Sequence, residues 1–356
     1  MYIKSFDVSI ISLPFLSPIF YADRWLDRLD SAILRLGDGA HFGYAEVPVT
    51  CAPNVSPEEI RKTLEEEYAP KVLGNSFMAV HELRDALGAL AERAIPFGAV
   101  EIAWWDLAAK IKGKPLHEML GAPYVLQEVF TSVDRPAGEY EDIDVNAFLE
   151  NVKSLADAGY VHLELKVRPG WERAMLHAVR QMLPGQSLHI DVEALMREKH
   201  VMSLCQLQDY LPWMIEQPLA ADDFVGHADL AGMLHTPIGL DESIVSVNAA
   251  KTALRLGGVK CLKINPVRVG GMEAVKDILT LCREHGADVW ISSPVQTGIG
   301  ASAALAAGCL EGVTGPFEYH DPKRYFAEAE MAAATWLPEP VREEDGLLRI
   351  GEGVKE

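Results

Sequence analysis

Short apolar segments alternate with helical patterns from about residue 126 onward, and this alternation restricts the possible folds more than any other feature. The segments are VFTSV, HLELKV, LHIDV, WMIEQ, IGLDE, CLKIN, DVWISS and GPFE. Eight short strands separated by helices predict an α/β fold with a parallel sheet, and in particular a TIM-like barrel. A doubly wound open sheet is the main alternative, because it shows the same alternation.

The rest of the chain falls outside this repeat. Residues 1–125 contain a few strands followed by helices, which predicts an N-terminal α+β domain. Residues 126–324 hold the predicted barrel. Residues 325–356 have no place in the strand count, and we expect this C-terminal segment to pack on the N-terminal domain.

Three acids directly follow consecutive apolar segments: Asp191 in LHIDV, Glu216 in WMIEQP and Asp241 in IGLDES. The steps from 191 to 216 and from 216 to 241 are 25 residues each. A strand, a turn, a helix and a second turn take roughly that many residues, so we expect each acid at the C-terminal end of a barrel strand. Three carboxylates at the barrel mouth would form an oxygen-only site, which suits Mg²⁺ and, as an alternative, Mn²⁺.

Two lysines belong to other strands of the repeat. Side chains two residues apart point the same way in a strand, so Lys166 shares a face with Glu164, and Lys263 shares a face with Asn265. A hydrogen on the carbon beside a carboxylate is a weak acid, and a cation must neutralise the charge that develops when it is removed. A lysine whose pKa is lowered by the metal and by desolvation can remove that hydrogen near neutral pH. The acids and lysines together predict a proton-abstraction site.

The composition argues against some classes of function. A formal charge of −20 and a pI near 5.0 argue against binding of nucleic acid or of an anionic membrane surface, since either requires a basic patch. No apolar run is long enough to span a bilayer, and the N-terminus lacks the pattern of a signal peptide. We therefore expect a cytoplasmic protein that acts on a small molecule.

The motifs resemble those of the enolase superfamily, in its muconate-lactonizing-enzyme subgroup. They are Lys166 in ELKVRPGW, Asp191 in HIDVE, Glu216 in IEQPL, Asp241 in GLDES and the segment KINPVRVGG. The pattern is most similar to the family of o-succinylbenzoate synthase and N-succinylamino acid racemase. The resemblance implies a modified (β/α)₇β barrel with an α+β capping domain, Mg²⁺ on the three acids, a small carboxylate substrate and a homo-oligomer. It also implies that residues 14–26 form a flexible loop that closes over the substrate.

Four positions depart from the pattern of that family. Glu164 stands where a lysine is usual, and Asn265 stands where the catalytic lysine of the sixth strand is expected. Glu193 replaces a common asparagine, and Gln296 replaces a usual glutamate. We expect the new acids to form a buried ion-pair network with Lys263, which would be tied to one of them.

Lys166 is therefore predicted as the principal base. Lys263 is a second catalytic candidate, and Asn265, Ser293 and Gln296 are candidates for substrate binding. A single base favours dehydration through an enolate, as in o-succinylbenzoate synthase, because racemization needs a base on each face of the carbon. The alternatives are a racemase or epimerase of N-acylamino acids or dipeptides, a cycloisomerase, and a metal-binding barrel without catalysis.

The start of the predicted helix GIGASAALAAG is a further candidate for anion contact. Backbone amides at a helix N-terminus favour a carboxylate, which here would belong to the substrate. The glycines of this segment would equally allow close packing, so both interpretations stay open.

Overall fold

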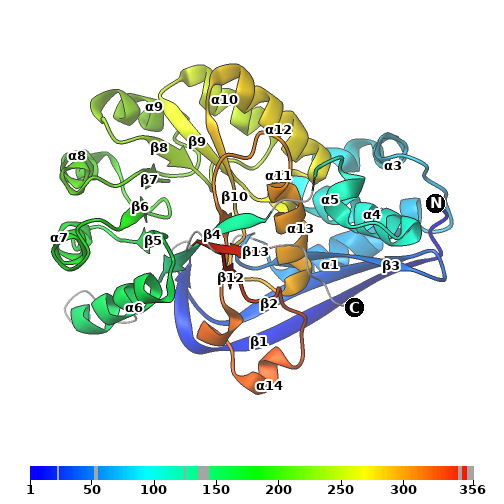
Figure 1. The fold of residues 1–356 in the computed structure, drawn as a ribbon. Coiled ribbons are helices and arrows are strands. Elements are labelled where there is room, and N and C mark those ends of the chain that lie inside the picture. Colours follow the sequence, from blue (N-terminus) through cyan, green and yellow to red (C-terminus); the bar gives the residue numbers. More distant parts are fainter. Residues whose placement is uncertain (22–23, 52–54, 124–125, 135–143, 344–346, 351–356) are drawn as a thin grey trace.

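The computed structural model describes residues 1–350 except 22–23, 52–54, 124–125, 135–143 and 344–346. These residues form a parallel barrel and a separate domain built on an antiparallel sheet (Figure 1). The predicted modified barrel with an α+β capping domain is thereby confirmed. No helix within the described ranges has the length and apolar character needed to cross a membrane.

The capping domain begins with a long antiparallel hairpin. Strand β1 (Ser5–Tyr21) pairs with β2 (Arg24–Gly37), and β3 (Phe42–Pro48) adds to the other edge of β2. The helices of this domain are α1 (Pro57–Thr63), α2 (Ala69–Val72), α3 (Val80–Leu87), α4 (Ala94–Lys112) and α5 (Leu116–Met119). Helix α4 approaches the barrel closely at Gly98, where a Cβ atom would lie 2.5 Å from the backbone oxygen of Val267.

The barrel strands of the described chain match the eight predicted segments. They are β4 (Gln127–Val133), β5 (His162–Lys166), β6 (Ser187–Asp191), β7 (Ile215–Glu216), β8 (Ile238–Leu240), β9 (Val259–Ile264), β10 (Asp288–Ile291) and β11 (Phe317–Glu318). Each strand from β4 to β10 pairs in parallel with the next, and β11 pairs in parallel with β4. The carbonyl oxygen of Val289 in β10 accepts hydrogen bonds from the nitrogens of Thr314 and Gly315, at 2.9 and 3.1 Å, just before β11. The sheet therefore curves back on itself, which excludes the open-sheet alternative.

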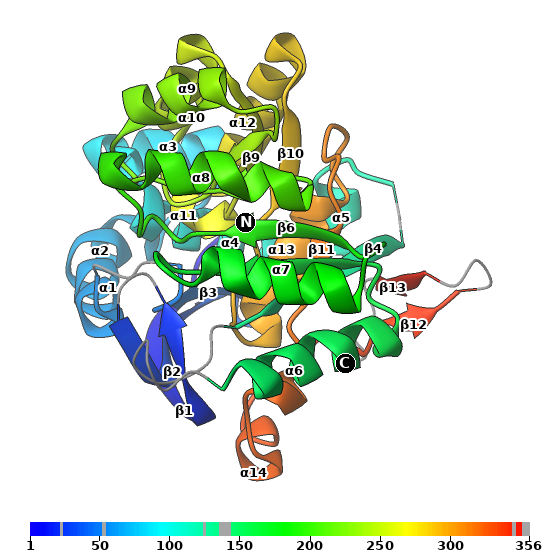
Figure 2. The same ribbon diagram turned by 90° about the vertical axis from the view of Figure 1, so that its left-hand side faces the viewer.

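Helices cover the outside of the barrel, and α6, α7 and α8 lie next to one another there (Figure 2). The covering helices are α6 (Val145–Ala158), α7 (Glu172–Met182), α8 (Val201–Leu207), α9 (Phe224–Met233), α10 (Val247–Leu256), α11 (Pro266–Val269), α12 (Met272–His285) and α13 (Gly298–Gly308). Because the strands are covered by helices outside and by side chains inside, polar groups reach a ligand at the strand ends.

The predicted capping segment at residues 14–26 forms the end of a strand pair over its described residues, so the predicted loop conformation is wrong there, and residues 22–23 lie outside the described ranges. Its position over the barrel mouth agrees with the prediction, because Phe20 and Tyr21 lie against residues of the barrel mouth. The pairing register shifts between Pro14 and Ile19, and beyond that shift the ring of Phe20 meets the ring of Trp25 edge to face, 5.1 Å between centroids. Aromatic pairs across two strands stabilise an extended hairpin, which explains why this segment forms strands.

The C-terminal segment contacts both domains. Tyr325 and Phe326, which precede α14 (Glu328–Met331), pack with Leu13 and Leu29 of the capping hairpin. Farther along, β12 (Val341–Arg342) pairs with β13 (Leu348–Ile350), and β13 adds to β4 of the barrel in antiparallel fashion. The limits of the three predicted domains stay a prediction.

Candidate active site at the barrel mouth

Asp191, Glu216 and Asp241 lie at the ends of three adjacent strands. Asp191 and Glu216 are the last residues of β6 and β7 and are paired in the parallel register, and Asp241 follows the last residue of β8. All three are buried. Binding of a metal ion by these residues stays a prediction.

Two polar side chains hold Asp241 in place. Oε1 of Gln217 accepts hydrogen bonds from the backbone nitrogens of Asp241 and Ser243, at 3.0 and 3.1 Å. Gln217 has a φ of 38°, a strained value for a residue other than glycine, and its hydrogen bonds to these two nitrogens help to hold that conformation. Arg268 donates to the backbone oxygen of Asp241 at 2.9 Å and forms an ion pair with its carboxylate.

Lys166 ends β5 and contacts three carboxylates. Its Nζ lies 2.8 Å from Oδ2 of Asp191, 3.0 Å from Oε1 of Glu193 and 3.3 Å from Oε1 of Glu164. Burial lowers the pKa of Lys166, but Asp191 and Glu164 outweigh burial, and the pKa stands well above its usual value. Among the described residues the carboxylates stabilise the ammonium form, and the expected lowering of this pKa by a bound metal stays a prediction.

Lys263 is likewise surrounded by carboxylates. Its Nζ lies 2.7 Å from Oε2 of Glu164, 3.1 Å from Oε1 of Glu216 and 3.4 Å from Oε1 of Glu318. Burial lowers the pKa of Lys263, but Glu164 and Glu216 raise it well above the usual value. The expected ion pair between Lys263 and one of the new acids is confirmed for Glu164, whereas Glu193 pairs with Lys166.

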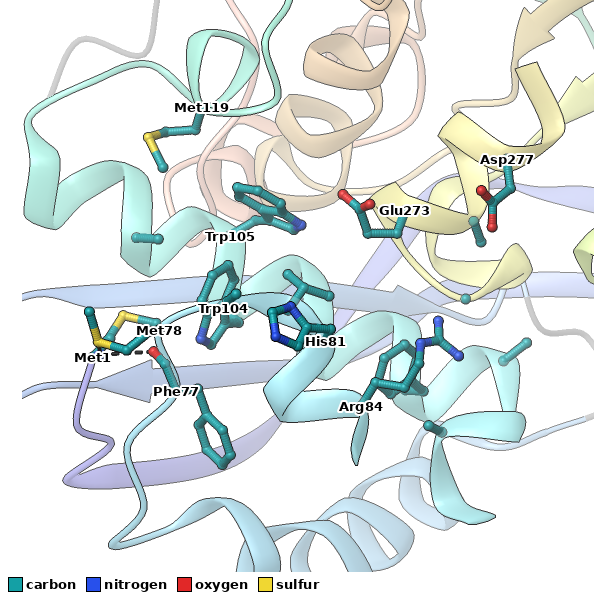
Figure 3. Close-up of a pocket in the computed structure, with 18 of the residues that line it drawn as sticks. Met1, Phe77, Met78, His81, Arg84, Trp104, Trp105, Met119, Glu273 and Asp277 are labelled. Atoms are coloured by element: carbon teal, nitrogen blue, oxygen red, sulfur yellow. Dashed lines mark hydrogen bonds between the residues drawn. The ribbon is translucent and has the colours of Figure 1, made fainter. Parts of the chain in front are cut away.

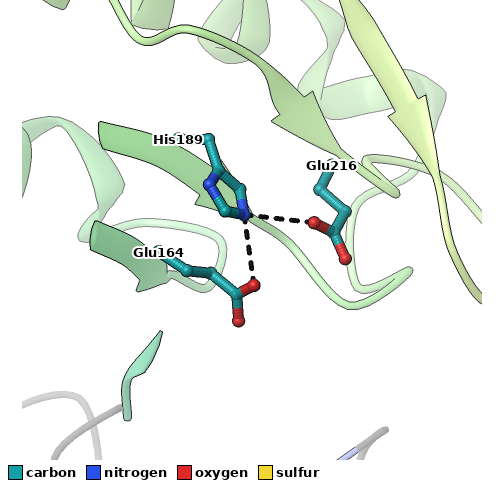
Figure 4. A group of neighbouring side chains, drawn as sticks. All are labelled: Glu164, His189 and Glu216. Carbon is teal, nitrogen blue, oxygen red and sulfur yellow. Dashed lines mark hydrogen bonds and ion pairs between the residues drawn. The ribbon is translucent and has the colours of Figure 1, made fainter. Parts of the chain in front are cut away.

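A histidine of β6 completes this network. Nε2 of His189 lies 3.1 Å from Oε2 of Glu164 and 3.2 Å from Oε2 of Glu216 (Figure 4). Ligand atoms of these residues lie within 4.8 Å of one another, an arrangement that could hold a metal ion. Burial lowers the pKa of His189, but its hydrogen bonds to Glu164 and Glu216 raise it to about 9. The imidazole is therefore protonated near neutral pH, and a metal ion would have to displace that proton.

A cavity of about 20 Å³ lies between the barrel mouth and the end of β1. Lys166, Asp191 and Asp241 line it from the barrel, and Phe20 and Tyr21 line it from β1. A volume of this size holds about one water molecule. In the structure the hairpin therefore covers the mouth and encloses the candidate site.

The groups around this cavity fit a hard divalent cation. Glu242 lines the cavity, and its Oε2 is buried without a hydrogen-bond partner among the described residues. Burial, and after it Asp241 and Asp191, raise the pKa of Glu242 well above its usual value. Carboxylate oxygens that are crowded and incompletely paired are the ligands that Mg²⁺ and Mn²⁺ prefer.

The candidates for substrate binding lie beside this cavity and do not line it. Oδ1 of Asn265 accepts a hydrogen bond from the backbone nitrogen of Arg268 at 3.1 Å and so caps α11. Nε2 of Gln296 donates to Oγ of Ser293 at 3.0 Å. Contact of these three residues with a substrate stays a prediction.

A carboxylate of the capping domain occupies the start of α13. Glu46 in β3 accepts hydrogen bonds from the backbone nitrogens of Thr297 and Gly300, at 3.1 and 3.0 Å. The expected contact of these amides with a substrate carboxylate is therefore wrong, and the close-packing interpretation holds. Glu101 in α4 binds the start of α12 in the same way, at 2.7 Å from the nitrogen of Met272.

A second cavity, of about 1030 Å³, lies between the capping helices and α12 (Figure 3). Trp104, Trp105, His81, Arg84 and Glu273 are among its lining residues. It is far larger than the cavity at the barrel mouth, but it contains none of the predicted site residues. We place the candidate site by its chemistry, at the strand ends.

Comparison with known proteins identifies the family. A model of the enolase C-terminal domain-like family matches residues 147–354. The chain belongs to this family. The predicted resemblance is thereby confirmed, and the matched range of this enolase C-terminal domain-like protein includes both lysines and all three candidate metal ligands.

Individual relatives agree with this assignment to the enolase C-terminal domain-like family. The o-succinylbenzoate synthase of Bacillus subtilis is 33% identical over 290 residues, which are 80% of this chain and 76% of that protein. The N-succinylamino acid racemase of Thermus thermophilus is 32% identical over 295 residues, 83% of this chain and 76% of that protein. A solved enolase-superfamily member from Listeria innocua has a TM-score of 0.84 and 26% identity, covering 98% of this chain and 92% of that chain. The prediction of an enolase-superfamily enzyme is confirmed.

Proposed function

We propose that this enzyme removes water from a small carboxylate, beginning with the proton on the carbon beside the carboxylate, as in o-succinylbenzoate synthase. The observation that carries the proposal is the difference between the two lysines that line the cavity. The closest partner of Lys166 is Asp191, at 2.8 Å, whereas the closest partner of Lys263 is Glu164, at 2.7 Å. Asn265, which follows the sixth barrel strand, has no group that accepts a proton. Removal of a proton and a hydroxyl from one face needs a base on that face alone.

We assign Asp191, Glu216 and Asp241 as ligands of a divalent cation, Mg²⁺ first and Mn²⁺ as the alternative. Their strand-end positions and the unpartnered oxygen of Glu242 support this assignment. A cation bound there would neutralise charge on the substrate carboxylate and compete with the ammonium group of Lys166 for Asp191.

The residues around Lys166 suit the role of an oriented base. Glu193 and Glu164, at 3.0 and 3.3 Å from Nζ, restrict the direction of the amine. Phe20 and Tyr21 line the cavity from the capping hairpin and would separate it from bulk water. Exclusion of water strengthens the electrostatic interactions on which proton abstraction depends.

Racemization is less well supported than dehydration. It requires a second base on the opposite face of the carbon, and Lys263 is the nearest candidate on the sixth strand. Three carboxylates surround each lysine and favour its ammonium form. A cation on Asp191 would weaken the closest ion pair of Lys166, whereas the closest partner of Lys263 is Glu164, which is not an assigned ligand.

The proposal is tested with two probes in the presence of Mg²⁺. N-succinylphenylalanine in deuterated solvent reports exchange of the α-hydrogen, and the hydroxylated cyclohexadiene carboxylate that loses water to give o-succinylbenzoate reports elimination. Lys166→Ala is expected to lose at least about 100-fold in both rates, since positioned acid–base catalysis contributes about that much. Lys153→Ala, at an exposed helix position, is the control and keeps both rates.

Three results would refute the proposal or one of its parts. Wild-type rates in Lys166→Ala would remove the lysine from the mechanism. Equal loss of exchange in Lys166→Ala and Lys263→Ala, after correction for the folded fraction, would refute a single base. Absence of both reactions in the wild-type enzyme would refute the proposed function itself.

A further inference from the structure

His320 lies two residues beyond β11 and lines the same cavity as Lys166. Its side chain is only 8% exposed, and its Nε2 has no hydrogen-bond partner among the described residues. Oε1 of Glu318 is 3.4 Å from that nitrogen, too far for a strong hydrogen bond. A buried polar atom left in this state costs free energy, and here it adjoins the space that a substrate would enter.

Two other residues fix the opposite nitrogen of this ring. The hydroxyl of Tyr325 donates to Oδ2 of Asp134 at 2.9 Å, and Nδ1 of His320 lies 3.1 Å from the same hydroxyl. A hydroxyl has one hydrogen to donate, so the oxygen of Tyr325 accepts a hydrogen bond from the Nδ1–H group of His320. Burial raises the pKa of Tyr325 well above its usual value, which keeps that hydrogen in place. Nε2 is therefore the nitrogen of His320 that is free to gain and lose a proton.

We propose that His320 is the general acid that protonates the departing hydroxyl group, a role that rests on the proposed dehydration. Lys166 in its amine form takes the proton from the carbon beside the carboxylate, and the electron pair of that C–H bond forms the new C=C bond. The C–O bond breaks with its electrons on oxygen. The Nε2–H bond of His320 breaks as the O–H bond forms, and water leaves. Lys166 ends as an ammonium ion and His320 as a neutral imidazole, and exchange of one proton with solvent restores both.

The order of the strands supports an acid and a base that act from one side. β4 alone separates β5, which ends in Lys166, from β11, which precedes His320. Both groups therefore approach the cavity from neighbouring parts of the rim. A hydroxyl and a hydrogen on the same face of a substrate can be reached by such a pair. The carboxylate of Glu318, 3.4 Å from Nε2, lies on the same side of the ring as the cavity group that the acid role requires.

The two probes described above separate this role from that of Lys166. In His320→Gln we expect elimination of water to fall at least about 100-fold, because the departing oxygen lacks its acid, while α-hydrogen exchange stays within threefold of wild type. His285→Gln replaces an exposed histidine and is the matched control. Tyr325→Phe removes the oxygen that orients the ring, and its elimination rate should lie between those of wild type and His320→Gln. Circular dichroism verifies that each variant is folded.

Several results would overturn the role of His320. If His320→Gln keeps elimination within threefold of wild type, the role of His320 is refuted while the proposed function stands. An equal loss of exchange and elimination in His320→Gln would also refute this role and leave the proposed function standing. Wild-type exchange without any elimination would refute the proposed dehydration, and this role with it. Absence of both reactions in wild type refutes the proposed function, and this role with it.

Nitrogen NMR of the ¹⁵N-histidine-labelled protein tests the geometry without any substrate. The signals that disappear in His320→Gln identify the ring, and the Nδ1 nitrogen should carry a hydrogen in wild type. Tyr325→Phe should allow the other neutral tautomer. A wild-type ring whose Nδ1 lacks hydrogen would contradict the arrangement on which the acid role depends.

Discussion

Replacing Lys263 by methionine tests the ion cluster beneath the barrel mouth. The side chain of Lys263 is 3% exposed, and its ammonium group pairs with Glu164, Glu216 and Glu318, which are 0%, 1% and 4% exposed. Methionine has a similar length but no charge, so three buried carboxylates would lose a shared partner. Removal of one partner of a buried ion pair costs about 3–5 kcal/mol, because the remaining charge is left uncompensated.

The assay is urea unfolding followed by circular dichroism at constant pH. With an m-value of about 3 kcal/mol/M, a loss of about 3–5 kcal/mol lowers the midpoint by about 1.0–1.7 M. The double variant Lys263→Met/Glu164→Met removes the closest pair together and should recover part of that loss, since an apolar replacement of a whole pair is often neutral. Lys153→Met, which breaks an exposed pair with Asp157, should change stability by less than about 0.5 kcal/mol.

A Lys263→Met midpoint equal to that of Lys153→Met would refute the reasoning, because the cluster would then not depend on this ammonium group. Additive losses in the double variant would refute the direct coupling of Lys263 with Glu164. The expected result also bears on catalysis. The activity of a Lys263 variant must be corrected for its folded fraction, because unfolding of the cluster would by itself lower the activity.

Other perturbations test the domain contact and the metal site. Burial raises the pKa of Glu101 from 4.5 to about 7, so the native state keeps this proton to higher pH than the unfolded chain, and stability falls as pH rises between these values. This group should lower the free energy of unfolding by about 3 kcal/mol over that pH range. Urea titrations of Glu101→Gln at several pH values should no longer show this decrease, and an unchanged decrease would contradict the raised pKa. Gly98→Ala should destabilise the protein by about 1–3 kcal/mol, because the new Cβ would meet the backbone of Val267. The control Gly232→Ala has open space around its Cβ and should stabilise the protein by about 0.5–1 kcal/mol. Equal effects of the two substitutions would contradict the close approach of α4. MgCl₂ at ten times its Kd should raise the free energy of unfolding by about 1.4 kcal/mol in thermal scans, and a similar rise in Asp191→Asn would argue against the assigned ligands.

The sequence alone was sufficient to predict the barrel and the positions of the acids at the ends of its strands. Period and spacing are local properties, and a parallel strand places its last residue at the mouth whatever the rest of the chain does. The positions of Asp191 and Glu216 at the ends of β6 and β7 follow from this. His189 could have been found by the same rule, because it lies two residues before Asp191 in the same strand and shares its face.

Contacts made by distant segments could not be found in this way. Asp134, His320 and Tyr325 follow different elements, and only the closed barrel brings them together. The placement of Glu46 at the start of α13 depends on how the capping domain docks on the barrel. The carboxylates that raise the pKa of Lys166 could not be predicted either, because no sequence pattern gives their distances from its Nζ.

The departures from the family pattern at Glu164 and Asn265 are coupled through the position of Lys263. In β9 the lysine stands at position 263, two residues before Asn265, which is about 6.6 Å deeper on the same face of the strand. At that depth it meets Glu164, which stands where a second lysine would have repelled it. Glu164 is the closest partner of Lys263, at 2.7 Å, and loss of either residue alone would unbalance the charge of the buried cluster. At the end of the sixth strand, Asn265 caps α11 where the family pattern has a lysine. Under the proposed mechanism, proton transfer would be confined to the side of the mouth that holds Lys166 and His320, which would favour elimination from one face over inversion of a carbon.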